Sequence, residues 1–542
     1  MRSILLAAAI VALPISTLAA VPSKAPPTKA TSAWWGHIKV LASPAYEGRL
    51  TGSPGYYKAA RYVAGKFKAA GLKPGGDAGT YFQAVTYLKE RVDAAHSSVA
   101  LVDGGKVTPL AVGPDLTLGA RDEQPKSVSA PLVFLGYGLH LPEAGYDDFA
   151  GQDLKGKVVV VLGGGPGSLS AALKSHASST EFPKALEAAG AVGVIRLQNP
   201  KAMDIPWPRL IALSSQPGMR LAEPELQTYH RAMFSASVNP EKAEALFAKS
   251  GHTFAELLAL ADARKPLPRF ALNQSVKAEV ASETRQIASP NVVGVLPGSD
   301  PNLKAQFVVV SAHLDHLGVG EPIKGDKVYH GAMDNAAGVA SMIETAKALR
   351  AQGHRLKRSI VFVAIAGEEK GLLGSRAYAE HPTVPKSAIV ADINMDEFLP
   401  LFPLKHLLVQ GEGESTLGDA AREVAAARGY DTLPDPAPDR NIFVRSDQYS
   451  FIKTGVPSVA LKVEGLPGSP EAQMDKDWNT NRYHSPQDDL TQPVDLKSAD
   501  DFDAYLLALV TRVADAKARP VWKTDSFFKR FDTTGAATGG QP

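Results

Sequence analysis

The sequence SIVFVAIAGEEKGLLGS, residues Ser359–Ser375, gives the strongest indication of the fold. Its first part is an unbroken apolar run of the kind that forms a strand buried on both faces of a parallel sheet. Two acids, Glu368 and Glu369, follow at the point where this strand should end. Adjacent carboxylates repel each other and resist burial unless a metal ion, a proton or a pair of bases compensates their charge. The rest of the sequence should therefore supply such compensating groups.

Segments with strand and helix patterns alternate along the chain from about residue 291. FVVVSAH, SIVFVAIAGEE and SAIVADINMDEF have the pattern of strands, whereas GVASMIETAKALRAQG and DAYLLALVTRVADAKA have that of helices. This alternation predicts an α/β fold with a mixed, mostly parallel sheet sandwiched by helices. In such sheets ligand sites form at the carboxyl ends of the strands.

Histidines and acids follow several of these predicted strands. They are His313, Asp315 and His316 after FVVVSA, Glu368 and Glu369, Asp392, Asp396 and Glu397 in SAIVADINMDEF, Asp334 in GAMDNAAG before a helix, and Tyr483 and His484 in NRYHSPQDD. The chain has no cysteine, and imidazoles with carboxylates are ligands that zinc and manganese accept. Taken alone, Asp334 could be only an N-cap and His484 only a loop histidine. Their shared place at one sheet edge favours a metal site.

The composition excludes several classes of protein. The chain has 542 residues, 44% hydrophobic and 21% charged, which is typical of a globular protein with about two to four domains. The formal net charge is +2 and no long basic run occurs, so the charge pattern gives no indication of nucleic-acid binding. The absence of cysteine excludes disulfides, thiolate metal sites and a cysteine nucleophile.

The N-terminal sequence MRSILLAAAIVALPISTLAA has the pattern of a signal peptide over residues 1–20. Arg2 supplies the positive charge, an apolar stretch interrupted by Pro14 follows, and small residues end it. A buried N-terminal helix is the alternative interpretation. The signal peptide predicts bacterial export, to the periplasm or as a secreted protein, with a Pro-rich linker over residues 21–32. A lipoprotein anchor would need a cysteine, and no other stretch is apolar and long enough to cross a membrane.

The remaining chain divides into segments with different predicted secondary structure. Residues 33–84 have a helical pattern, and residues 85–285 consist of short β-rich runs with a helical insert, PEKAEALFAKSGHTFAELLALADA. The alternating strands and helices occupy residues 286–520. Residues 521–542, which end in DTTGAATGGQP, are predicted to form a C-terminal tail.

Five motifs, SAHLDHLG, GAMDNAAGVA, AGEEKGLLGS, NMDEF and YHSPQDDL, occur in this order within residues 291–518. Together they resemble the co-catalytic di-zinc aminopeptidases, the family that also contains glutamate carboxypeptidases and the transferrin-receptor ectodomain. LASPAYEGRLTGSPGYYKAARYVAGKFKAAGLKP resembles the helix pair before the catalytic core in many members. This implies that residues 33–84 are the N-terminal helical part of the peptidase domain and residues 286–520 its catalytic part. VFLGYGLHLPEAGYDDFAGQDLKGKVVVVLGGGPG resembles the start of a protease-associated domain, which residues 85–285 would form as an insertion.

The resemblance implies two zinc ions and assigns their ligands. Asp334 would bridge the two ions. His313 and Asp396 would complete the protein ligands of one ion, and Glu369 and His484 those of the other. The positive charge of the metals would then compensate the adjacent carboxylates.

The resemblance also assigns three residues to the chemistry. Glu368 would be the general base, and it can differ in role from Glu369 because neighbouring residues at a strand end point to different sides. Asp315 would accept the second ring N–H of His313 and fix its tautomer. Tyr483 occupies a place where some members have a tyrosine that hydrogen-bonds the developing oxyanion.

The implied function is that of an exported zinc-dependent exopeptidase, an aminopeptidase that hydrolyses N-terminal residues from peptides with a metal-activated water. A carboxypeptidase is an alternative, because Arg440 and Arg445 could hold a substrate carboxylate. A glutaminyl cyclase and a catalytically inactive binding protein share the scaffold, although the intact ligand set and Glu368 argue against an inactive protein. Peptides are the expected substrates. The sequence identifies no substrate-binding residues, no side-chain specificity and no oligomeric state.

The sequence departs from the family pattern at two places near the predicted site. Met333 precedes Asp334 where the family often has a polar residue, and Gln448 stands where many relatives carry histidine. Neither is a predicted ligand, so these departures bear on substrate preference. The predicted insertion, residues 85–285, contains none of the five ligands. We therefore expect it to form a lid or wall beside the metal site and to contribute no catalytic group.

Overall fold

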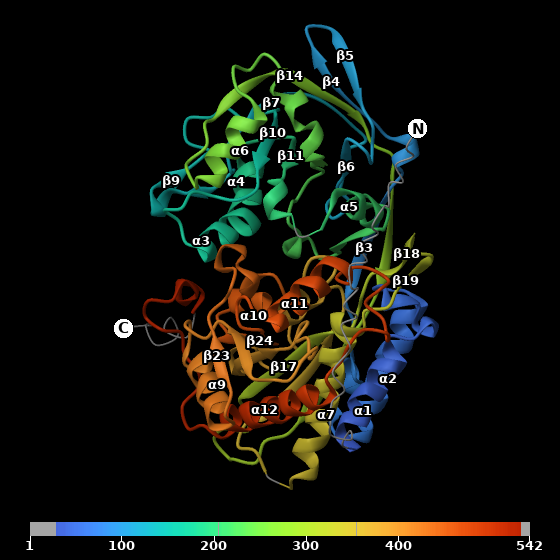
Figure 1. The fold of residues 1–542 in the computed structure, drawn as a ribbon, viewed down its shortest axis with the longest axis vertical. Coiled ribbons are helices and arrows are strands. Elements are labelled where there is room, and N and C mark those ends of the chain that lie inside the picture. Colours follow the sequence, from blue (N-terminus) through green and yellow to red (C-terminus); the bar gives the residue numbers. More distant parts are fainter. Residues whose placement is uncertain (1–28, 204, 354, 533–542) are drawn as a thin grey trace, which may run out of the picture.

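The computed structural model describes residues 29–203, 205–353 and 355–532. The predicted signal peptide, most of the predicted linker and the end of the predicted tail lie outside these residues. Among the helices of this described part, none is both long and apolar enough to cross a membrane. Figure 1 shows two bodies of secondary structure stacked along the long axis.

The lower body is built on a mixed sheet of nine strands among the described residues. In spatial order the strands are β1 (Lys73–Pro74), β16 (Asn291–Leu296), β20 (Ser359–Ile365), β17 (Phe307–His313), β21 (Ile389–Asn394), β24 (Ser458–Val463), β22 (His406–Gln410) and β23 (Asp431–Leu433), with β2 (Phe82–Gln83) beside β16. β17 pairs in parallel with β20 and β21, and β21 with β24, whereas β16 is antiparallel to β20. The predicted α/β class with a mixed sheet is confirmed.

Helices cover both faces of this sheet, as the pattern predicted. The helices are α1 (Lys29–Leu41), α2 (Pro54–Ala69), α7 (Ala337–Ala351), α8 (Leu373–Glu380), α9 (Thr416–Ala427), α10 (Gln448–Lys453), α11 (Pro470–Asn481) and α12 (Leu496–Asp515). Because successive side chains of a strand point to opposite faces, Val308 and Val310 of β17 enter a core shared with α1, α2, α7 and α12. Val309 enters a second core with Tyr378 of α8 and Phe451 of α10.

The upper body contains a separate mixed sheet of eight described strands (Figure 1). In spatial order they are β5 (Lys106–Leu110), β4 (Ser98–Asp103), β14 (Phe270–Glu279), β7 (Ser127–Phe134), β10 (Val158–Leu162), β11 (Gly193–Leu197), β13 (Phe234–Val238) and β6 (Leu116–Leu118). Its helices include α3 (Ala171–His176), α4 (Phe182–Ala188) and α6 (Phe254–Asp262). This sheet has hydrophobic cores of its own. All of these elements fall inside the segment 85–285, although its identity as a protease-associated domain stays a prediction.

The chain passes between the two bodies through adjacent strands. β3 (Thr86–Val92) leads into the upper body, and β15 (Ser282–Ala288) returns antiparallel to it. β12 (Gly218–Leu221) pairs with the other edge of β3. The segment 85–285 therefore leaves and re-enters the lower body at neighbouring points, as expected for an insertion.

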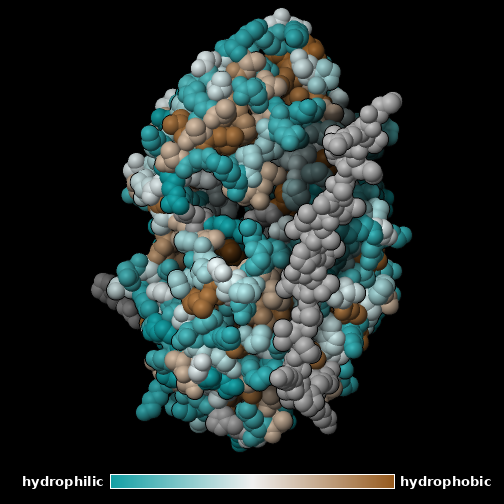
Figure 2. All heavy atoms as spheres, viewed as in Figure 1, coloured by the Kyte–Doolittle hydropathy of each residue, from teal (hydrophilic) through white to brown (hydrophobic). Residues whose placement is uncertain are grey.

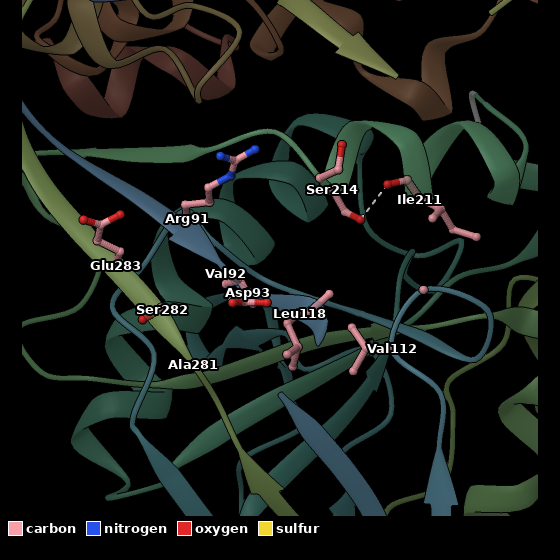
Figure 3. A pocket seen from close by; sticks show the side chains of 13 residues that line it. Arg91, Val92, Asp93, Val112, Leu118, Ile211, Ser214, Ala281, Ser282 and Glu283 are labelled. Carbon is pink, nitrogen blue, oxygen red and sulfur yellow. Dashed lines mark hydrogen bonds between the residues drawn. The ribbon is translucent and has the colours of Figure 1, made fainter. Parts of the chain in front are cut away.

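A cavity of about 630 Å³ lies beside these connecting strands. Figure 3 shows Val92 of β3, Ser282 of β15 and Ile211 of α5 (Trp207–Ser214) in its walls. Helix α5 therefore has open space on one side. It also contacts β18 (Gly318–Ile323), which forms a hairpin with β19 (Asp326–Tyr329) in the lower body.

The segment 521–532 packs on the lower body, in contrast to the predicted tail. Trp522 and Phe528 are buried in one apolar cluster with Phe443, and Trp522 forms an isolated bridge with Ser415. The prediction of a tail rested on the polar, glycine-rich residues at the end of the sequence and did not consider these aromatic side chains. Elsewhere, the face visible in Figure 2 is mostly hydrophilic, with apolar residues in small groups.

Candidate metal centre

The five predicted ligands converge at one edge of the lower sheet. His313 ends β17, Glu369 follows β20 and Asp396 follows β21. These three strands are neighbours in parallel, so their carboxyl ends meet at the same edge. Asp334 precedes α7, and His484 lies in the connection between α11 and α12.

Each carboxylate oxygen of Asp334 faces one of two groups of candidate metal ligands. In the first group, His313 Nε2 lies 3.2 Å from Asp334 Oδ1 and 3.1 Å from Asp396 Oδ1. In the second, His484 Nε2 lies 3.3 Å from Asp334 Oδ2 and 3.1 Å from Glu369 Oε2. The two groups thus have the partition that the resemblance implies.

His316 is a further donor at this centre, and the sequence had assigned it no role. Its Nδ1 lies 2.7 Å from Glu369 Oε1 and 3.7 Å from Asp334 Oδ2, and its ring is fully buried. The signal in the sequence was HLDH, which places His316 three residues after His313 at the same strand end. His316 can orient Glu369 or bind metal beside it.

Asp315 contacts the His313 ring through a different group from the one predicted. The second ring nitrogen of His313, Nδ1, lies 3.1 Å from the main-chain oxygen of Asp315, whereas the nearest carboxylate oxygen is 4.0 Å away. The carboxylate instead accepts hydrogen bonds from the Thr51 hydroxyl at 2.9 Å and from the Glu368 main-chain N–H at 3.1 Å. The compact turn after β17 brings the carbonyl closer to the ring than the side chain. Asp315 thus still fixes the imidazole, but through its backbone, while its side chain positions Glu368.

Glu368 lies beside the first group of donors. Burial raises the pKa of its carboxyl well above the ordinary value, His313 opposes this shift, and the negative charge of Asp396 adds to it. A carboxylate whose affinity for protons is raised by its surroundings suits a general base. Its location is compatible with the predicted role.

The ring of Tyr483 stacks on that of His484, with centroids 3.8 Å apart and planes 25° apart. Burial raises the pKa of the Tyr483 hydroxyl well above its usual value, and the charges of Glu397 and Asp334 act in the same direction. The hydroxyl therefore stays protonated at neutral pH and can donate a hydrogen bond.

Asp488 joins two loops of the centre and was missed by the sequence reasoning. Its carboxylate accepts the main-chain N–H of Met333 at 3.0 Å and that of Asp334 at 3.0 Å, and Gln492 Nε2 donates to it at 2.8 Å. The motif YHSPQDDL contained this residue, but nothing local distinguished it from the neighbouring Asp489.

Arg49 is a fully buried cation beneath the centre. It donates to the carbonyl oxygens of Leu314 at 2.9 Å, Leu41 at 2.8 Å, His330 at 2.7 Å and Gly331 at 2.8 Å. Burial lowers its pKa to about 10, so it keeps its charge at neutral pH. Arg49 therefore fixes the turns next to His313 and Asp334 and places a positive charge among the acids.

Other candidate residues lie behind or beside the centre. Asp392 is buried in the sheet and accepts from Ser311 at 2.7 Å. Glu397 lies 3.3 Å from Lys462. Gln448 is fully buried: Nε2 donates to the Phe443 carbonyl and Oε1 accepts from Asn394. The expectation that this departure affects substrate preference finds no support, because both functional groups of Gln448 are occupied within the fold.

The donor set fits zinc, which accepts imidazole nitrogens and carboxylate oxygens. Ligand atoms of His313, Asp334 and Asp396 all lie within 4.8 Å of one another, and so do those of His316, Asp334 and Glu369. Asp334 Oδ2 is buried and has no hydrogen bond of normal geometry, although His484 Nε2 and His316 Nδ1 lie 3.3 and 3.7 Å away. Such an oxygen is costly unless a cation or proton compensates it, so these residues fit a metal-binding role.

Comparison with known proteins agrees with this interpretation. Residues 291–510 match peptidase family M28. The probable leucine aminopeptidase 2 of Aspergillus oryzae is 27% identical over 270 residues, 47% of this chain and 51% of the relative. Leupeptin-inactivating enzyme 1 of Streptomyces exfoliatus is 26% identical over 238 residues, 42% of this chain and 50% of the relative. The chain thus spans about half the length of these curated relatives.

Two solved structures resemble almost the whole chain. An aminopeptidase from Aneurinibacillus sp. strain AM-1 superimposes with a TM-score of 0.53 at 18% identity, covering 92% of this chain and 97% of that one. A zinc aminopeptidase from Bacillus subtilis gives a TM-score of 0.51 at 21% identity, covering 91% of this chain and 97% of that one. At these identities the similarity establishes the fold.

Proposed function

We propose that the protein is an exported, zinc-dependent aminopeptidase that removes N-terminal residues from peptides, in agreement with the match of residues 291–510 to peptidase family M28. One observation carries the proposal. The two oxygens of Asp334 face two separate histidine–carboxylate pairs, while Glu368 lies beside them at the end of β20. This arrangement supports two metal ions that share one carboxylate, with an independent base next to them.

Five residues of the centre would bind the two zinc ions. One zinc ion would be held by His313 and Asp396, a second by Glu369 and His484, and both by Asp334. When bound, the ions would act as Lewis acids on the scissile carbonyl and raise the acidity of a water.

Glu368 would accept a proton from the attacking water and pass it to the leaving amine. The backbone of Glu368 is fixed because its main-chain N–H donates to the Asp315 carboxylate at 3.1 Å. Tyr483 would donate its hydroxyl hydrogen to the oxyanion of the tetrahedral intermediate. The raised pKa of the Tyr483 hydroxyl, which keeps it protonated at neutral pH, supports this role.

The exposed side of the centre indicates where a peptide would bind. The Asp396 and His484 side chains are 19% and 20% exposed, whereas His313 is 1% exposed and Asp334 3%. A substrate would therefore approach over Asp396. In the proposed aminopeptidase, acids near the metals, such as Glu397 next to Asp396, would hold the free amine of the N-terminal residue.

The test measures metal content and turnover on matched substrates. We expect the purified protein to contain zinc and to hydrolyse a peptide with a free amine, and a strong chelator should abolish this activity. The N-acetylated version of the same peptide should not be cleaved. Active protein without metal would refute the zinc mechanism. Preferential cleavage of the acetylated peptide would indicate a carboxypeptidase, and release of pyroglutamate from glutaminyl peptides a cyclase.

A further inference from the structure

One arginine of the upper body reaches the loop that carries the candidate ligand His484. Arg209 lies on α5, and it donates from Nη2 to the Thr480 carbonyl at 2.9 Å and from Nη1 to the Tyr483 carbonyl at 3.1 Å. Thr480 belongs to the last turn of α11, and Tyr483 directly precedes His484. The contact thus joins two segments more than 270 residues apart in sequence.

The carbonyl groups that Arg209 binds need a partner. The last carbonyls of a helix have no donor within the helix and carry a partial negative charge. A guanidinium supplies several donors in a fixed plane together with a full positive charge. Arg209 can therefore hold the end of α11 and the following turn at the same time.

The backbone at His484 requires such support. Its φ angle is 50°, in the left-handed region that non-glycine residues seldom adopt. Conformations of this kind persist only when the surroundings hold them in place. Arg209 fixes the carbonyl directly before His484, and Tyr483 stacks on the His484 ring.

Helix α5 contacts β18 of the lower body but borders open space on one side. Ile211 and Ser214 face the cavity of about 630 Å³ (Figure 3), so the helix is not packed densely on that side. The indole N–H of Trp207 donates to the Gly113 carbonyl at 3.1 Å, which anchors the start of α5 within the upper body. Within the part of the chain that the structure describes, Arg209 makes the hydrogen bonds that link α5 to the loop of His484.

We propose that Arg209 is a positioning residue of the hydrolytic centre, which acts from the inserted segment on Tyr483 and His484. The inference rests on the proposed function. The insertion would thus take part in catalysis without contributing a group that touches the substrate, because it fixes the conformation of the loop that supplies a metal ligand and the oxyanion donor.

The test compares Arg209→Met with a matched control, Arg376→Met. Arg376 also links the two bodies, since it donates from α8 to the Leu226 carbonyl of the upper body at 3.0 Å, but it does not contact the loop of His484. We expect Arg209→Met to lower kcat by about 10–100-fold with a smaller change in KM. Arg376→Met should keep kcat within a few-fold of the wild type, even if its Tm falls. Arg209→Lys, which can reach one carbonyl, should lie between Arg209→Met and the wild type.

A double-mutant cycle with Tyr483→Phe and a metal titration complete the test. If Arg209 acts through Tyr483, the loss of kcat caused by Arg209→Met should be smaller in the Tyr483→Phe background. Zinc affinity should also fall in Arg209→Met and not in Arg376→Met. Equal losses in both arginine variants, or an unchanged kcat in Arg209→Met, would overturn the proposal. Wild-type protein that turns over no peptide would instead refute the proposed function.

Discussion

Glu368 and Glu369 are adjacent in sequence but face different partners in the structure. Glu369 contacts the ring nitrogens of His316 and His484 at 2.7 and 3.1 Å. Glu368 lies near His313, and its main-chain N–H is held by Asp315. The alternation of side chains at a strand end separates the two carboxylates. The histidines around Glu369 and the proposed metals compensate their charge, which explains how a buried strand can end in two acids.

Glu368 should be essential for turnover but not for metal binding. Replacing Glu368 with glutamine removes the proposed base and keeps the size of the side chain, so kcat should fall by about 10²–10⁴-fold with zinc content unchanged. Steady-state kinetics and elemental analysis measure the two effects. In the matched variant Glu369→Gln, zinc content should fall. A near-normal kcat in Glu368→Gln would show that another group is the base.

His316 should contribute to metal affinity through Glu369. Because His316 Nδ1 lies 2.7 Å from Glu369 Oε1, His316→Ala should weaken zinc binding by about 10–100-fold. A zinc titration against a competing chelator measures this. His330 is the control, since it is also buried but contacts the Ala42 carbonyl and Asp326. Equal affinities in His316→Ala and the wild type would mean that Glu369 needs no such support.

The loops that follow the strands are the elements that form the centre, and side chains tie these loops together. Asp488 binds the main chain before α7, and Asn335 Nδ2 donates to the Met395 carbonyl at 2.8 Å, next to Asp396. Arg49 binds the turns after β17 and before α7. Each loop alone would be mobile, and these buried polar contacts fix their relative positions.

Loss of the Asp488 carboxylate should destabilise this arrangement strongly. In Asp488→Ala two buried main-chain donors, on Met333 and Asp334, lose their acceptor, which should lower the free energy of unfolding by about 2–4 kcal/mol. Denaturant unfolding measures the change. The neighbouring variant Asp489→Ala removes two hydrogen bonds from Thr491 and an ion pair with Arg482 at 3.6 Å. These groups are partly exposed to water, so this variant should cost much less. Equal losses would show that Asp488 has no special role.

At the scale of the whole molecule, the two bodies contact each other at several places, one of which is the loop of the candidate metal ligand His484. Besides Arg209, His176 of the upper body contacts the Tyr449 hydroxyl at 3.3 Å, and His381 lies 3.2 Å from Glu223. The connecting strands also enter the core of the lower body, where Tyr87 and Leu221 are buried. Deletion of residues 85–285 would remove these core residues, so the lid hypothesis is better tested on the full enzyme.

The insertion should make activity depend on substrate length. If it forms a wall beside the centre, kcat/KM should fall as peptides with the same first residue are lengthened, and it should be lowest for the N-terminus of a folded protein. A length series from dipeptides upward measures this, with total hydrolysis by acid as the control for peptide concentration. A constant kcat/KM across all lengths would refute the lid hypothesis.

Zinc should stabilise the whole molecule, because several acids of the centre lie close together. Ligand binding to the folded state alone adds about 2.7 kcal/mol when free zinc is 100 times Kd. We therefore expect chelation to lower Tm and restored zinc to raise it again. A Tm that does not change on chelation would mean that the bound metal has no energetic link to the fold.

Much of the fold and of the site follows from the sequence itself. The apolar strands, the helical spacing between them and the acids and histidines at the strand ends predicted the α/β sheet and a cluster of candidate metal ligands, since these patterns are local. The resemblance selected five ligands from this cluster and divided them between two ions. In the structure, His313 with Asp396 and His484 with Glu369 lie at opposite oxygens of Asp334. The identity of the bound metal and the roles of these residues stay predictions.

Only the tertiary structure reveals the contacts that hold these groups in place. The Asp315 carbonyl at His313, the carboxylate of Asp488 at Met333 and the guanidinium of Arg209 at Tyr483 all act through main-chain atoms. Main-chain atoms are the same in every residue, so no motif marks them as partners. The sequence by itself determined which side chains stand at the sheet edge, because strand ends are set by local pattern. Which of them touch was decided by tertiary packing, because it depends on how distant loops meet.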